Sequence, residues 1–189
     1  MEELTRRIQT EGRNLGKGIL KTDSFINHQI DPALMVQVGQ EMGRRFADAN
    51  VNKVLTAEIS GIAPALATGQ AMDVPVVYAR KTRPVTMTGP VFVEVAPSHT
   101  KGRDVFLMVS TEFLGPGDRV LVVDDFLATG ATISALVRLV RHAGAELVGI
   151  GTVVEKVFEG GRKDLEALGV PIVSLAMVTD MSNGKIILA

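Results

Sequence analysis

The sequence predicts an α/β domain with a mostly parallel sheet of about five strands flanked by helices. Short apolar runs typical of buried strands alternate with runs at helical spacing along nearly the whole chain. At two places, residues 54–64 and 119–132, a strand leads through small residues directly into a helix. Because parallel strands end at the same edge of a sheet, polar residues that follow them should gather in one crevice.

The composition fits a single domain over residues 1–189. Of these residues 46% are hydrophobic, and the core must be mainly aliphatic, because there are seven Phe, one Tyr and no Trp. With 20 basic and 21 acidic residues the net charge is −1, so no nucleic-acid partner is expected. The absence of Cys excludes disulfides and thiolate chemistry. The first residues lack the apolar core of a signal peptide, and no apolar run has the length of a membrane span, so we expect a soluble, cytoplasmic protein with no membrane partner.

The individual elements follow from apolar periodicity and from the residues that interrupt it. Asp31 and Pro32 mark a helix start, with an acidic N-cap and proline at the first helical position. Residues 15–30 are expected to form a loop that can include a short strand at 18–21. The expected helices cover residues 2–13, 31–49, 65–72, 133–143 and 162–168. The expected strands cover residues 54–57, 74–79, 91–95, 105–110, 120–123, 146–155, 172–178 and 185–188.

The most informative stretch, residues 119–132, reads R-V-L-V-V-D-D-F-L-A-T-G-A-T. Its apolar run predicts a buried strand, and Asp124 and Asp125 stand where we expect this strand to end. The small-residue turn at 128–132 leads into a helix, whose N-terminus presents free N–H groups and the positive end of its dipole to a phosphate. Two carboxylates beside a phosphate site fit a sugar phosphate whose hydroxyls, or a magnesium ion, lie between them.

The motif D-D-F-L-A-T-G-A-T resembles the signature of the type I phosphoribosyltransferases. In that family the acidic pair holds the ribose hydroxyls of phosphoribosyl pyrophosphate (PRPP), and the loop holds its 5′-phosphate. The resemblance implies catalytic roles for Asp124 and Asp125. It implies Mg²⁺ as a cofactor held mainly through PRPP, with no metal ligand directly from the protein. The PRPP-binding loop then consists of Ala128, Thr129, Gly130, Ala131 and Thr132.

Two other strand ends should contribute to the same crevice. Ser60 and Gly61 follow the strand at 54–57 and form a second candidate anion site, for the leaving pyrophosphate. Arg80 and Lys81 follow the next strand, and we assign Lys81 to PRPP. Whether Arg80 or Lys81 makes this contact, and in its own or the partner subunit, stays open. The alternative for both is an ordinary solvated strand end.

Residues 82–101 contain three prolines and no helical period. We expect a flexible β-ribbon from the strands at 91–95 and 105–110. Its linking segment, around His99 to Lys101, would form a lid that excludes water, which otherwise competes as nucleophile. His99 receives no role, because a lone loop histidine is usually just solvated.

Residues 23–32 and 155–162 are similar to the xanthine phosphoribosyltransferases of bacterial purine salvage, and this resemblance covers essentially the whole chain. It implies a homodimer in which residues 1–35 contribute a hood over the base. It places Leu20, Asn27 and Lys156 on xanthine. A lysine ammonium suits the acceptor-rich edge of xanthine, and an Asn can donate and accept in one plane. The alternatives are a surface lysine at a strand end and an Asn that forms a turn.

One position departs from that family, which tends to carry Asn where Thr129 stands here. A-T-G-A-T is more similar to the adenine-specific relatives. The competing functions are therefore an adenine or a guanine/hypoxanthine phosphoribosyltransferase. A regulator that only senses PRPP and binds nucleic acid would require a DNA-binding module or a basic surface, neither of which the sequence offers. Binding of a dinucleotide or a nucleoside triphosphate is not expected, because the sequence contains neither of the glycine-rich motifs that bind these ligands.

Overall fold

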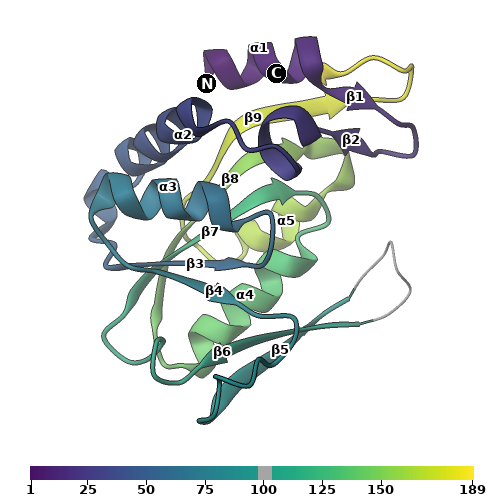
Figure 1. The fold of residues 1–189 in the computed structure, drawn as a ribbon. Helices are drawn as coiled ribbons and strands as arrows, with labels where there is room; N and C mark the ends of the chain where they lie inside the picture. The colour runs from purple at the N-terminus through teal and green to yellow at the C-terminus, as the bar shows by residue number, and fades with distance from the viewer. Residues whose placement is uncertain (98–103) are drawn as a thin grey trace.

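The computed structural model describes residues 1–97 and 104–189 and has a six-stranded central sheet with the order β10-β9-β8-β7-β3-β4 (Figure 1). The strands from β9 to β4 are mutually parallel, and β10 pairs antiparallel with β9 at one edge. The predicted fold class is therefore confirmed. These six strands are β3 (Lys53–Ala57), β4 (Val76–Ala79), β7 (Arg119–Leu127), β8 (Glu146–Lys156), β9 (Ile172–Asp180) and β10 (Ile187–Leu188).

Helices cover both faces of the sheet, as Figure 1 shows. They are α1 (Glu2–Glu11), α2 (Pro32–Arg45), α3 (Ile62–Met72), α4 (Ala131–His142) and α5 (Gly161–Glu166). The first three pack on one face around side chains such as Leu4, Val38 and Met42. The last two pack on the other face through Leu136 and Leu165. Both cores are largely aliphatic, as the composition predicted. Among the described residues no helix is long and apolar enough to cross a membrane.

The start of α2 shows how a local signal fixes an element. Asp31 is the N-cap, and its Oδ1 accepts hydrogen bonds from Ala33 N at 3.0 Å and Leu34 N at 3.1 Å. Pro32 occupies the first helical position, where a missing N–H costs nothing. The α-helix ends at Arg45 and a 3₁₀ turn, η2 (Ala47–Ala49), completes the predicted span.

Two sequence expectations were wrong. The strand β7 does not end before the acidic pair but continues to Leu127, because its backbone ladder with β8 still pairs Asp124 with Thr152 and Leu127 with Glu155. The segment expected as loop contains a π-helical turn, η1 (Asp23–Asn27). Phe25 and Ile26 fix this turn, since both are almost fully buried in the core.

Two small antiparallel units extend from the sheet. The pair β1 (Arg13–Asn14) and β2 (Leu20–Lys21), together with α1 and η1, forms the N-terminal segment that we call the hood. The ribbon of β5 (Val91–Ala96) and β6 (Val105–Ser110) is confirmed where the sequence placed it. The proposed lid around His99 to Lys101 lies outside the described residues.

Candidate active site

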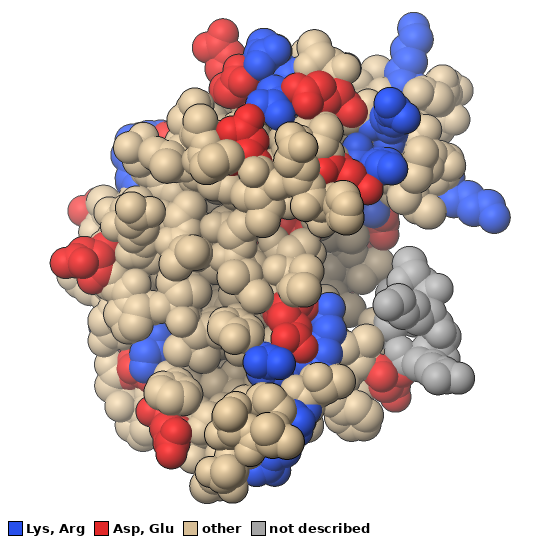
Figure 2. Space-filling model, viewed as in Figure 1, with Lys and Arg blue, Asp and Glu red and all other residues tan. Residues whose placement is uncertain are grey.

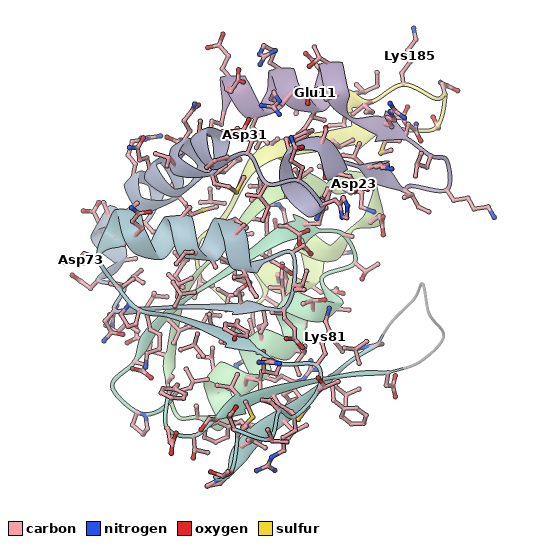
Figure 3. The ribbon with its side chains drawn as sticks, in the orientation of Figure 1. Glu11, Asp23, Asp31, Asp73, Lys81 and Lys185 are labelled. Atoms are coloured by element: carbon pink, nitrogen blue, oxygen red, sulfur yellow. The ribbon has the colours of Figure 1, made fainter. Side chains whose placement is uncertain are left out.

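Four segments that follow or end parallel strands meet at one edge of the sheet. They are the junctions after β3 and β4, the end of β7 with the loop that follows it, and the end of β8. Together they contain all the site residues predicted outside the hood. Figure 2 shows that the surface is hollowed between the hood above and the ribbon below, with charged side chains at the rim. Lys81 stands on the ribbon side of this region (Figure 3).

The acidic pair lies at the floor of the site. Asp124 is 6% exposed and Asp125 8% exposed, and Asp125 N donates to Asp124 Oδ1 at 3.0 Å. Burial raises the pKa of Asp124 well above its ordinary value, and the charge of Asp125 raises it further, while Lys81 acts in the opposite direction. Two adjacent carboxylates with this little solvent require hydroxyl donors or a cation.

The loop after β7 has the geometry of a phosphate site. Gly130 has a φ of +79°, a left-handed conformation that favours glycine, and it turns the chain into α4. Within the described residues no side chain caps this helix, so its first N–H groups point outward without a side-chain acceptor. Thr129 is exposed beside them. The predicted loop residues 128–132 therefore lie at one helix N-terminus, next to the acidic pair.

The junction after β3 lies directly against the acidic pair. A Cβ placed on Gly61 would lie 2.6 Å from Asp124 Oδ1 and 2.2 Å from Thr56 Oγ1, so only glycine fits there. Ser60 precedes it, and the Glu58–Ile59 peptide bond of the same junction is cis. The structure therefore brings Ser60 and Gly61 to the acidic pair, as the parallel topology predicted.

Glu58 pairs with the side chain of Arg80 but only with the backbone of Lys81. Its carboxylate binds Arg80 Nε at 2.8 Å and accepts a hydrogen bond from Lys81 N at 2.6 Å. The Arg80 guanidinium also lies 5.6 Å from the centre of the Tyr78 ring. Arg80 is thereby engaged in packing, whereas the Lys81 side chain is exposed. Glu58 is a structural partner that the sequence analysis missed.

The hood meets the end of β8 through Lys156. The Lys156 ammonium donates to Gly18 O at 3.0 Å and forms an ion pair with Glu159. Leu20 lies on β2 with its side chain largely buried. The sequence shows Glu159 three residues after Lys156, but the contact between them depends on the 3₁₀ turn η3 (Val157–Glu159), which brings the Glu159 carboxylate back to the Lys156 ammonium.

Asn27 joins the hood to the acidic pair. Its Nδ2 donates to Asp125 Oδ2 at 2.6 Å, and its Oδ1 accepts from the Thr22 hydroxyl. The prediction placed Asn27 over the base, and the structure shows Asn27 hydrogen-bonded to Asp125, the acid that the sequence analysis expected to bind the ribose. Neither Thr22 nor this contact could be identified from the sequence, because 98 positions separate Asn27 from Asp125.

A second polar cluster lies at the carboxyl end of β8, around Glu155. Glu155 is 1% exposed and accepts hydrogen bonds from Arg162 and Ser174. Burial would raise the pKa of this carboxylate, but the bonds from Arg162 and Ser174 outweigh burial and hold the pKa below its ordinary value. The sequence analysis assigned no role to this cluster.

The residues present fit a magnesium ion carried by the substrate. In the described part of the chain no group of three His, Cys, Asp or Glu side chains could hold a metal. Asp124 and Asp125 nevertheless offer carboxylate oxygens, the donors that Mg²⁺ prefers, and burial raises the pKa of Asp124 above its ordinary value. An ion that takes its remaining ligands from phosphate oxygens and water suits this site.

Comparison with known proteins identifies the family. The phosphoribosyl transferase domain matches residues 35–173. The chain belongs to the phosphoribosyltransferase family. It is 50% identical over 184 residues to the xanthine phosphoribosyltransferase of Deinococcus deserti, covering 97% of this chain and 95% of the relative. It is 47% identical over 186 residues to that of Moorella thermoacetica, covering 98% and 95%. These relatives confirm the resemblance inferred from residues 23–32 and 155–162.

Solved phosphoribosyltransferases share the fold. The adenine phosphoribosyltransferase of Thermoanaerobacter pseudethanolicus has a TM-score of 0.75 at 24% identity, covering 93% of this chain and 98% of that one. The enzyme from Giardia lamblia, complexed with 9-deazaadenine, has a TM-score of 0.77 at 22% identity, covering 94% and 98%. At these identities the likeness concerns the fold alone.

Proposed function

We propose that this phosphoribosyltransferase converts xanthine and PRPP to xanthosine 5′-monophosphate and diphosphate in purine salvage. The observation that carries the proposal is the convergence of an uncapped helix N-terminus, a buried acidic pair and a hood-bound lysine at one sheet edge. Its full-length relatives at 44–50% identity are named xanthine phosphoribosyltransferases. The base assignment rests on those relatives together with Lys156.

In the proposed reaction the C1′–oxygen bond of PRPP breaks and a C1′–N9 bond to the base forms. Pyrophosphate leaves with the bonding electrons, and the base loses its N9 proton. Asp124 and Asp125 bind the ribose hydroxyls and stabilise the positive charge that develops at C1′. The loop at 128–132 holds the 5′-phosphate. Magnesium, when bound, neutralises charge on the pyrophosphate.

The leaving group is bound on the opposite side of C1′ from the base. Ser60 and Gly61 present the backbone that receives pyrophosphate, and Lys81 supplies the cation, because Arg80 is already paired with Glu58. In keeping with the resemblance to its relatives, we further propose that the enzyme works as a cytoplasmic homodimer.

Lys156, Asn27 and Leu20 select the base. The ammonium of Lys156 turns from Gly18 O and Glu159 to the carbonyl oxygens of xanthine, which are hydrogen-bond acceptors. When the ribose binds Asp125, the hydrogen bond between Asn27 and Asp125 breaks and Asn27 contacts the purine instead. Leu20 packs on the face of the purine ring. Adenine would present an amino donor to the ammonium, and two donors facing each other are repulsive.

Nucleotide formation with PRPP and magnesium, measured separately with xanthine, guanine, hypoxanthine and adenine, tests this assignment. We expect a large preference for xanthine. Lys156→Ala should lower kcat/KM for xanthine by about a hundredfold, since a charged hydrogen bond in a buried site contributes roughly 1.5–3 kcal/mol, with PRPP binding unchanged. Lys163→Ala, at an exposed position on α5, is the matched control and should behave as wild type.

A specific observation favours adenine as the second candidate base. The turn A-T-G-A-T carries Thr129 where the xanthine family tends to carry Asn. A preference for adenine in the same assay would show that this loop reports the base better than the hood does. Tight PRPP binding without product from any base would instead assign the protein to the sensors.

A further inference from the structure

The buried polar cluster at the carboxyl end of β8 takes no part in the proposed reaction. Glu155 directly precedes Lys156 in this strand. Arg162 Nε donates to Glu155 Oε1 at 2.8 Å, and Arg162 Nη2 donates to Oε2 at 2.5 Å. Ser174 Oγ donates to the same carboxylate at 2.6 Å and lies 2.9 Å from Thr152 Oγ1. A two-pronged guanidinium–carboxylate pair fixes both direction and separation, which a single hydrogen bond does not.

Gly161, the residue before Arg162, is in contact with residues 128–132, which we call the phosphate loop. Gly161 N donates to Ala128 O at 3.1 Å. A Cβ on Gly161 would lie 2.3 Å from Ala128 O and 2.5 Å from Gly130 N, so the two backbones pack without space for any side chain. The first two residues of α5 therefore hold the phosphate loop on one side and the residue before Lys156 on the other.

We propose that Arg162 is a positioning residue that fixes the distance between the phosphate loop and the base-binding end of β8. This inference rests on the proposed function, since it takes the ribose phosphate and the base as the ligands at the two ends. The reaction requires C1′ and N9 to lie within reacting distance at the same time, so the separation of their two binding sites enters the rate. Arg162 touches neither ligand in this scheme and acts through Glu155 and Gly161.

Hydrogen–deuterium exchange of the unliganded enzyme tests the coupling directly. Arg162→Lys keeps the charge but cannot form the two-pronged pair. We expect about tenfold faster amide exchange both at 126–133 and at 154–160, because both segments lose the same anchor, and no change in α2. Arg45→Lys is the matched control, since Arg45 makes an exposed pair with Glu41 at 2.8 Å on α2. Faster exchange in only one of the two segments, or in neither, overturns the proposal.

Steady-state kinetics supply a readout that a merely structural role would not change. In Arg162→Lys the KM for PRPP and the KM for xanthine should both rise about tenfold, and kcat should fall about tenfold or more. A lower melting temperature with all three constants unchanged for the folded enzyme would mean that the cluster only stabilises the fold.

Glu155→Gln keeps the shape of the carboxylate and removes its charge, so it should show the same exchange and kinetic changes as Arg162→Lys. If Arg162→Lys does not fold, Glu155→Gln provides the test of the proposal. A wild-type enzyme that forms no nucleotide with any purine would refute the proposed function. The exchange experiment would still decide whether Arg162 couples the two segments.

Discussion

At the scale of single residues, the acidic pair is unfavourable for folding. Asp124 is buried next to a second carboxylate, and burial and the charge of Asp125 both raise its pKa. Lys81 compensates only in part. We therefore expect this carboxylate to serve the reaction, since a neutral side chain of the same shape would fold more easily.

Asp124→Asn should therefore raise stability while it lowers activity. Because the folded pKa of Asp124 lies above the unfolded value near 3.8, its neutral form is favoured on folding. The penalty for its ionisation is absent below that unfolded value and fully present above the folded pKa. We expect the melting temperature of the unliganded variant to exceed that of wild type by several degrees at pH 7, and the difference to shrink towards pH 4.

The same variant should lose about tenfold to a hundredfold in kcat/KM, because it loses a charged hydrogen bond to the ribose. Asp164→Asn changes an exposed carboxylate on α5 and provides the control for the amide substitution. An Asp124→Asn melting temperature below that of wild type at pH 7 would contradict the assignment of a strained, functional carboxylate.

At the scale of elements, the site depends on backbone-to-backbone packing at strand ends. The junction between β3 and α3 approaches the acidic pair so closely that Gly61 has no space for a Cβ beside Thr56 and Asp124. The start of α5 packs equally closely on the phosphate loop through Gly161. Glycine is required at both places by close approach, and neither residue is selected for a positive φ.

Gly61→Ala should disable catalysis more than folding. Its methyl group would lie 2.6 Å from Asp124 Oδ1, so the carboxylate or the junction must move. A displacement of about 1 Å at a reacting centre costs on the order of a hundredfold in rate. Steady-state kinetics with PRPP and xanthine measure the loss. Gly115→Ala is the control, since a Cβ there meets nothing within 4 Å, and equal activity of the two variants would contradict the close contact.

At the scale of the whole molecule, one crevice collects residues from distant parts of the chain. The N-terminal amine donates to Leu175 O at 2.8 Å, and so ties the start of the hood chain to β9. Asn27 then reaches Asp125 across the site. With a net charge of −1, the enzyme offers no overall attraction to the polyanion PRPP. We therefore expect the affinity for PRPP to come from local groups, namely the α4 N-terminus, Lys81 and magnesium.

PRPP with magnesium should therefore stabilise the enzyme strongly, and PRPP with a chelator should do so much less. A ligand at a hundred times its Kd adds about 2.7 kcal/mol to the free energy of unfolding. Thermal melting in the presence of PRPP, with Mg²⁺ or with EDTA, measures the difference. Magnesium alone is the control and should have little effect, since the described residues form no metal cluster. Equal stabilisation by PRPP in EDTA would exclude the magnesium requirement.

The sequence by itself determined the α/β class, the parallel sheet, the ribbon and the phosphate loop. These depend on periodicity, on an N-cap such as Asp31 and on small-residue junctions, which are signals between residues close in the chain. That Asp124, Gly130 and Lys156 would lie near one edge of the sheet followed from the parallel topology, because such strands end at a common edge. The end of β7 was placed too early because hydrophobicity stops at Asp124 while the backbone ladder does not.

Only the tertiary structure decided which side chains meet. Asn27 binds Asp125, Lys156 binds Gly18 O and Glu159, and Arg162 binds Glu155. The π-helical turn η1, too, was invisible as a local pattern, since Phe25 and Ile26 hold it only by packing into the core. Such contacts depend on distances between residues far apart in sequence. Those distances are fixed only when the whole sheet and both helical layers have packed.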